Sequence, residues 1–132
     1  MPLFTPRSWL LAVSYGVLTL LPSVASEGKR LSDMRYFRQH KSFVEEGDRL
    51  STYTVGLCYC GGIGVARDSV EAYAYWSLRE TRDQEEARWA RYLLEKEISP
   101  ETKRLGEVRA RTLQQELDAK VASYGVGKKL AL

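Results

Sequence analysis

Apolar side chains recur every three or four positions along most of this chain, which is the spacing of an amphipathic helix. The first such stretch covers residues 33 to 46. Its stripe is formed by Met34, Phe37, Lys41 and Val44, with Tyr36, His40 and Phe43 beside it. The pattern predicts a helix here, and its repetition along the chain predicts an all-α protein.

Four more helices are predicted downstream. They lie between Gly47 and Gly61, from Ser69 to Arg82, from Gln84 to Glu97, and from Pro100 to about Tyr124. Asp68 or Ser69 can cap the third helix, because a short side-chain oxygen accepts from free backbone N–H groups. Ser99 and Pro100 form a strong start signal for the last helix. The chain is therefore expected to form one compact bundle of five helices.

Gly56, inside the second predicted helix, indicates that another segment packs closely against this helix. The stripe of this helix consists of Tyr53, Gly56, Leu57 and Cys60. Glycine inside a helix costs about 1 kcal/mol relative to alanine, so a helix crossing near Ala72 is the expected reason for Gly56. The run from Gly61 to Gly64 suits a helix end and a tight turn, because glycine adopts positive φ without strain. The result is a helix, a glycine loop and an antiparallel helix.

Specific residue spacings surround this loop. They involve Val55, Gly56, Tyr59, Gly62, Gly64, Val65, Asp68, Ala72, Tyr75 and Trp76. In these spacings the chain resembles the Sel1-like repeat, a helical-hairpin relative of the tetratricopeptide repeat, over about residues 47 to 83. It departs from the family pattern in the inverted Tyr75-Trp76 pair and at Arg79, Glu80 and Asp83. The resemblance implies antiparallel helical hairpins in a short right-handed array that serves as a scaffold or adaptor for other proteins.

Residues 1 to 26 have the composition of an export signal. Arg7 supplies a short positive region, and residues 9 to 21 are mostly apolar. This apolar stretch is close to the ~7–15 residues of a secretory core and shorter than the ~20 residues that span a bilayer. Cleavage after Ala25 or Ser26 is expected, and an uncleaved N-terminal anchor is the alternative. The protein is therefore expected to be exported, either to the periplasm or as a secreted protein.

Composition and charge divide the rest of the chain and exclude one class of partner. Residues 27–32 are expected to be a polar lead-in, residues 33–124 the Sel1-like helical domain, and residues 125–132 a flexible tail. All 17 acidic residues and all but one of the 20 basic residues follow Ser26, which leaves a formal charge of +2. Nucleic-acid binding needs Lys and Arg clustered on one face. Because basic and acidic residues are so nearly balanced, nucleic acid is not expected to be a partner.

Cys58, Cys60 and His40 are the first candidates for chemistry. Cysteines two residues apart on a helix point about 200° apart, given ~100° per residue. Two free, partly buried thiols are favoured, with an intermolecular bridge or a strained pair as alternatives. Structural zinc takes about four Cys or His ligands, which is more than these three residues supply. Neither a metal nor another cofactor is expected.

The sequence assigns no catalytic residue, because the single histidine has no evident nucleophile beside it. It predicts a non-enzymatic protein–protein interaction module. One alternative is a small exported hydrolase-like enzyme, in which His40 would lie within hydrogen-bond reach of Cys58 or Cys60. Another is a membrane-tethered subunit of an envelope complex, and a membrane is a partner only if residues 1–26 are retained.

The expected partner surface lies on and beside the fourth helix. The apolar face of this helix consists of Trp89, Ala90, Leu93 and Leu94. Arg79 and Glu80 replace small family residues, so Trp89 and Tyr92 are expected to be only partly covered. A partly exposed aromatic beside an arginine is the usual composition of an interface hot spot. Trp89, Tyr92 and Arg79 are therefore the predicted binding residues for another protein.

Overall fold

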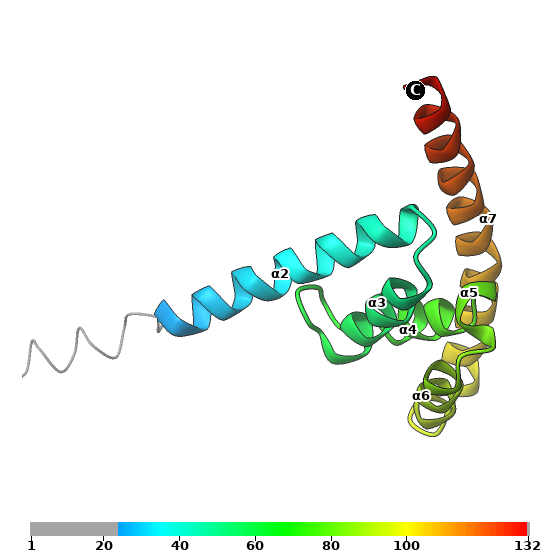
Figure 1. The fold of residues 1–132 in the computed structure, drawn as a ribbon. Helices are drawn as coiled ribbons and strands as arrows, with labels where there is room; N and C mark the ends of the chain where they lie inside the picture. Colours follow the sequence, from blue (N-terminus) through cyan, green and yellow to red (C-terminus); the bar gives the residue numbers. More distant parts are fainter. Residues whose placement is uncertain (1–23, 132) are drawn as a thin grey trace, which may run out of the picture.

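The computed structural model describes residues 24–131, and all its regular elements in that range are helices. They are α2 (Val24–Glu45), α3 (Arg49–Gly61), α4 (Ser69–Trp76), α5 (Arg79–Arg82), α6 (Glu85–Glu95) and α7 (Pro100–Leu130), as Figure 1 shows. The all-α prediction is confirmed. The predicted number of helices is wrong, because the described part of the chain contains six rather than five.

The first two of these helices, α2 and α3, pack as an antiparallel pair. The Nδ1 atom of His40 lies 3.0 Å from the Oγ atom of Ser51 near one end of the pair. Further along, the rings of Phe37 and Tyr59 meet edge to face, with centroids 5.4 Å apart. Val44 is buried in a core cluster that also contains Val55 of α3. The predicted stripe of α2 therefore faces the rest of the domain.

A glycine loop returns the chain from α3 to α4. Gly62 ends α3 with a φ of 68°, and Gly64 follows with a φ of 71°, values at which a Cβ atom is unfavourable. The carboxylate of Asp68 caps α4 by accepting from the backbone N–H of Glu71 at 3.0 Å. The indole N–H of Trp76, at the end of α4, donates to the carbonyl of Tyr53 in the first half of α3 at 3.2 Å. The antiparallel helix–loop–helix prediction is thus confirmed.

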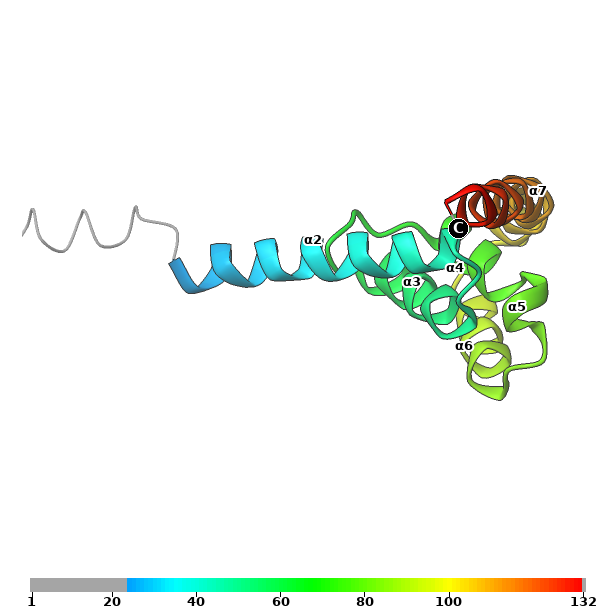
Figure 2. The same cartoon turned by 45° about the horizontal axis from the view of Figure 1, so that its top comes forward.

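The short helix α4 is the centre of the fold. Every side chain from Ala72 to Trp76 is at most 4% exposed. In both views α4 lies between α3 and α7, and α6 also packs against it (Figures 1 and 2). A helix that is apolar on all sides must be covered on all sides, so α4 determines where its three neighbours lie.

The single helix predicted from Ser69 to Arg82 is wrong. The backbone is extended at Leu78, with a φ of −67° and a ψ of 157°, and this separates α4 from α5. The hydroxyl of Thr81 donates to the carbonyl of Tyr75 at 2.8 Å, and so satisfies an acceptor that the end of α4 leaves unpaired. Because Thr81 is fully buried, packing rather than helix propensity determines this break.

Both ends of the described chain are more helical than predicted. Residues 27–32, expected as a polar lead-in, belong to α2, and most of the expected tail at 125–132 belongs to α7. The last helix therefore does not end near Tyr124. Side chains from 118 to 131 are all exposed, and this end of α7 projects from the other helices in Figure 1. The expected signal peptide, residues 1–26, falls largely outside the described residues.

Candidate functional site

Helix α6 turns its largest apolar side chains toward solvent and its smaller ones toward the core. Ala87 and Leu94 are buried, whereas Trp89 is 61% exposed, Tyr92 48% and Leu93 45%. The predicted apolar face of this helix is therefore only partly correct. Ala87 and Leu94 share one core cluster with Tyr73 and Trp76 and other residues. The positions of α6 that contact the two rings of α4 thus hold aliphatic side chains, and both aromatic side chains of α6 face solvent.

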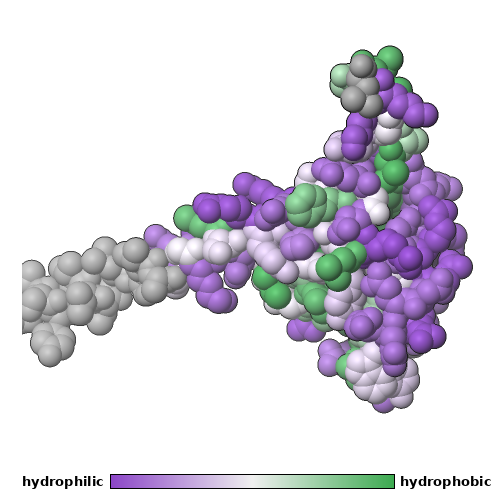
Figure 3. Space-filling view, viewed as in Figure 1, coloured by the Kyte–Doolittle hydropathy of each residue, from purple (hydrophilic) through white to green (hydrophobic). Residues whose placement is uncertain are grey.

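The exposed aromatic residues form an ordered group. The rings of Trp89 and Tyr92 stack with centroids 5.4 Å apart and planes inclined by 29°. The Nζ atom of Lys96 lies 4.3 Å from the centroid of the Tyr92 ring, within the range of a cation–π contact. We call Glu85, Trp89, Tyr92, Leu93 and Lys96 the α6 outer face. Weakly polar and apolar side chains gather over α6 at the lower end of the space-filling view (Figure 3).

An open hollow of about 510 Å³ adjoins the α6 outer face. Glu85, Glu86, Arg88 and Trp89 line it. Three of these four residues are charged and one is a large aromatic. Such a surface offers one apolar anchor with polar groups around it, which is the general composition of a protein-binding hot spot and its rim.

Arg79, the third predicted binding residue, lies away from this face. Its guanidinium is 2.6 Å from the carboxylate of Asp118 on α7 and 3.4 Å from that of Glu80. Its backbone N–H donates to the side chain of Gln114 at 2.9 Å. The hydrogen bond to Asp118 raises the pKa of Arg79 above its usual value. The break after α4 places Arg79 against α7 and not beside Tyr92. The cation beside Tyr92 is Lys96. The sequence reasoning missed Lys96, although it follows Tyr92 at the i, i+4 spacing of neighbours on one helix face.

The structure pairs His40 with Ser51 and not with a cysteine. Cys58 is buried, Cys60 is half-buried, and both thiols are free. Burial raises the pKa of Cys58, which disfavours the reactive thiolate. Among residues 24–131, no group of three or more His, Cys, Asp or Glu side chains has the arrangement of a metal site.

Ser51 is a potential nucleophile that the sequence reasoning did not identify. Its residue is only 2% exposed, and its backbone N–H donates to the carboxylate of Asp48 at 2.7 Å. A hydrogen bond from the Ser51 hydroxyl, followed by this one from the backbone N–H, lowers the pKa of Asp48. In a catalytic triad the carboxylate orients the imidazole, whereas Asp48 caps the N-terminus of α3. The geometry is therefore that of a helix cap reinforced by His40.

A second polar group joins α2, α4 and α7. The ammonium of Lys41 donates to the hydroxyl of Tyr75 and lies 5.0 Å from the centroid of its ring. Burial lowers the pKa of Lys41 and raises that of Tyr75. Close by, the Nε atom of Arg109 on α7 is 2.5 Å from the carboxylate of Glu71 on α4. These side chains satisfy one another, so the group holds three helices together.

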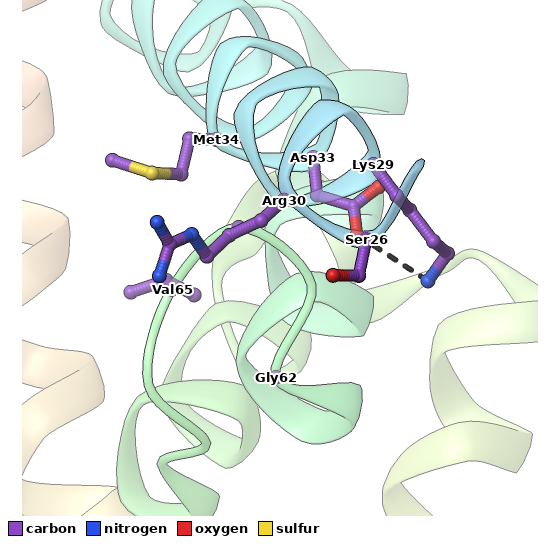
Figure 4. A pocket seen from close by; sticks show the side chains of 8 residues that line it. Ser26, Lys29, Arg30, Asp33, Met34, Gly62 and Val65 are labelled. Atoms are coloured by element: carbon purple, nitrogen blue, oxygen red, sulfur yellow. Dashed lines mark ion pairs between the residues drawn. The ribbon is translucent and has the colours of Figure 1, made fainter. Parts of the chain in front are cut away.

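A third feature is a hollow of about 550 Å³ between the start of α2 and the glycine loop. Figure 4 shows Arg30 extending from α2 toward Val65 of the loop, with Lys29 and Asp33 on the other side. Lys29 and Asp33 form an ion pair at 3.6 Å. The hollow marks the point where the loop rests on α2.

No family model, curated protein or solved structure matches this chain. Within the described residues, none of the helices has both the length and the apolar character needed to cross a bilayer. With no relative to identify a site, geometry alone selects one, and the α6 outer face with its stacked, exposed aromatic rings is the strongest candidate.

Proposed function

We propose that this protein is an exported, non-enzymatic interaction module that binds another protein through the α6 outer face. The observation that carries the proposal is the exposure of Trp89, at 61%, beside the stacked ring of Tyr92. Trp and Tyr are the residues enriched among interface hot spots. Both rings sit on a regular helix and support each other, so docking a partner orders few additional side-chain torsions.

The Sel1-like resemblance supports the same role from a separate part of the chain. It implies a scaffold or adaptor, and it covers the α3–α4 hairpin that holds α6 through α4. That this hairpin is one unit of a right-handed helical array is part of the proposal. On this view the core helices supply a rigid base, and α6 supplies the contact surface.

Photo-cross-linking tests the proposed binding face. A photoreactive phenylalanine analogue would replace Leu93, which is 45% exposed on the α6 outer face, in one variant and Gln115, an exposed residue of α7, in the matched control, so that Trp89 and Tyr92 stay in place. Both variants would be irradiated in the cell envelope after export. Protein adducts are expected from position 93 and not from position 115. If position 93 yields no protein adduct in a folded variant, this face is not a binding site.

The export part of the proposal rests on residues 1–26, where a basic residue precedes an apolar stretch and small residues. Side chains from Ser26 to Ser32 are all exposed, so a chain that begins near Glu27 keeps the buried contacts of the described domain. Intact-mass measurement of the exported protein is expected to give an N-terminus near Glu27. A mass that includes residues 1 to 21 would support the membrane-tethered alternative.

The second candidate function is a small exported hydrolase-like enzyme. The distance of 3.0 Å between Ser51 Oγ and His40 Nδ1 is the observation that favours it. The burial of Ser51 and the position of Asp48 at the helix cap oppose it. We therefore rank it below the interaction module.

A further inference from the structure

We infer that the protein bound by the α6 outer face is a second copy of this chain, docked with its own α6 antiparallel to the first. This inference rests on the proposed function, since it names the partner of the same face. The two copies would be related by a two-fold axis that passes midway between Trp89 and Tyr92. Such isologous pairing is the commonest way in which soluble proteins form dimers.

The residue spacing of the α6 outer face is self-complementary. An axis midway between positions 89 and 92 is also midway between positions 85 and 96. In the antiparallel pair, Trp89 of each copy therefore faces Tyr92 of the other, and Glu85 of each copy faces Lys96 of the other. All four residues lie on the exposed side of α6, opposite the buried Ala87.

The charges at the two ends of this face favour the antiparallel arrangement. Glu85 is exposed in the first turn of α6 and takes part in none of the ion pairs found within the described residues. Lys96 follows the last turn, and its ammonium touches the Tyr92 ring. A parallel pair would bring Glu85 against Glu85 and Lys96 against Lys96. Like-charge contacts oppose association, and opposite charges select the register.

The size of the face predicts a reversible dimer. A buried Trp or Tyr covers roughly 150–250 Å², and these two rings are already about half covered in one copy. Together they offer on the order of 200 Å², well below the roughly 800 Å² per partner of a standard stable interface. The copies are therefore expected to exchange between monomer and dimer and to dissociate on dilution.

Charge reversal tests the register directly. The protein purified after export would be studied by sedimentation velocity over a wide concentration range at low salt. Glu85→Lys alone and Lys96→Glu alone should each weaken self-association several-fold, because each places like charges opposite one another twice. The double variant Glu85→Lys/Lys96→Glu should restore it. Glu107→Lys, which makes the same charge change on an exposed part of α7, is the matched control and should leave it unchanged.

A mixture of the two single variants provides the sharpest test. In the mixed dimer, the introduced lysine of one copy faces the introduced glutamate of the other, and the native Lys96 faces the native Glu85. Equal amounts of Glu85→Lys and Lys96→Glu should therefore associate more strongly together than either does alone. Circular dichroism would first establish that each variant is folded. Trp89→Ala should abolish association whatever the charges.

Three results in solution would overturn the inference. The first is a native protein that stays monomeric at the highest concentration of the sedimentation series. The second is a dimer that responds to Glu107→Lys as strongly as to Glu85→Lys. The third is a mixture of the two single variants that associates no more strongly than either variant alone. Cross-linking at position 93 separates this inference from the function on which it rests. Adducts with the mass of two copies support both, adducts only with a different protein overturn the second-copy partner alone, and a lack of adducts overturns both.

Discussion

The indole ring of Trp76 occupies the space in which a side chain at residue 56 would begin. A Cβ atom on Gly56 would lie 2.7 Å from Cδ1 and 2.8 Å from Cε2 of that ring. The prediction that Gly56 marks a close approach is therefore confirmed, although the close neighbour is Trp76 and not Ala72. The absence of a side chain at residue 56 is what lets α3 and α4 bury this tryptophan.

Gly56→Ala is expected to destabilise the fold even though alanine is the better helix former. The overlap with Trp76 should cost about 1–3 kcal/mol beyond the gain in helix propensity of about 1 kcal/mol. Gly56→Leu should cost more. Urea denaturation would measure the free energy of unfolding. Gly28→Ala in α2 is the control, because an added Cβ there meets nothing within 4 Å, and it should not destabilise the fold. If both alanine variants had the same free energy of unfolding, Gly56 would not be required at the helix crossing.

The two left-handed glycines of the loop should respond differently to alanine. At Gly64 a Cβ would overlap the carbonyl of Asp33 and lie 2.8 Å from the backbone nitrogen of Met34, whereas at Gly62 the nearest atoms are 3.7 Å away. Gly62→Ala should cost only the ~1–2 kcal/mol of a left-handed residue. Gly64→Ala should cost more and should speed hydrogen exchange at the start of α2. Equal exchange in the two variants would show that the loop does not hold α2.

Tyr73 should make stability fall at alkaline pH. Its hydroxyl donates to the carboxylate of Glu95 at 3.0 Å, and burial followed by this hydrogen bond raises the pKa of Tyr73 to about 12. The unfolded tyrosine titrates near pH 10. Between these values the folded state binds more protons than the unfolded state, so stability falls as pH rises. Titration of Tyr73 should therefore lower the free energy of unfolding by about 2 kcal/mol between pH 9 and pH 11.5.

Tyr73→Phe supplies the comparison for this pH effect. Urea denaturation of both proteins at pH 9 and pH 11.5 would give four free energies of unfolding. The difference between native and variant should shrink toward high pH, because phenylalanine does not titrate. Tyr75, the other buried tyrosine among the described residues, is present in both proteins, so its contribution to the difference cancels. A difference that is the same at both pH values would mean that Tyr73 titrates alike in the folded and unfolded states.

Ser51 is expected to be chemically inert. A fluorophosphonate probe, which labels activated serines, should not label the folded protein, because Ser51 is buried and Asp48 does not orient His40. Ser51→Ala should instead lower the free energy of unfolding by about 1–3 kcal/mol, through loss of the hydrogen bonds of its hydroxyl with His40 and with the Asp48 carboxylate. Labelling of the native protein that disappears in Ser51→Ala would favour the hydrolase-like alternative.

Local signals account for the parts of the fold that could be predicted. Helix boundaries at Gly62, Asp68 and Ser99 depend on backbone geometry and on capping oxygens within three residues, so the sequence around each is sufficient. The ends of α2 and α7 were predicted less well. The pattern predicts a polar lead-in at 27–32 and a flexible tail at 125–132, yet α2 includes all of the first segment and α7 most of the second.

Local patterns in the sequence are sufficient to predict the helices, the turn of the α3–α4 hairpin and the close helix contact at Gly56. The break between α4 and α5 depends instead on packing, because the hydroxyl of Thr81 reaches the Tyr75 carbonyl only in the folded core. Packing also decides which side of α6 is exposed. Periodicity marks Trp89 as apolar, but the rings of α4 occupy the volume that a buried tryptophan on α6 would need, and competition for volume between distant residues leaves no local trace in a sequence.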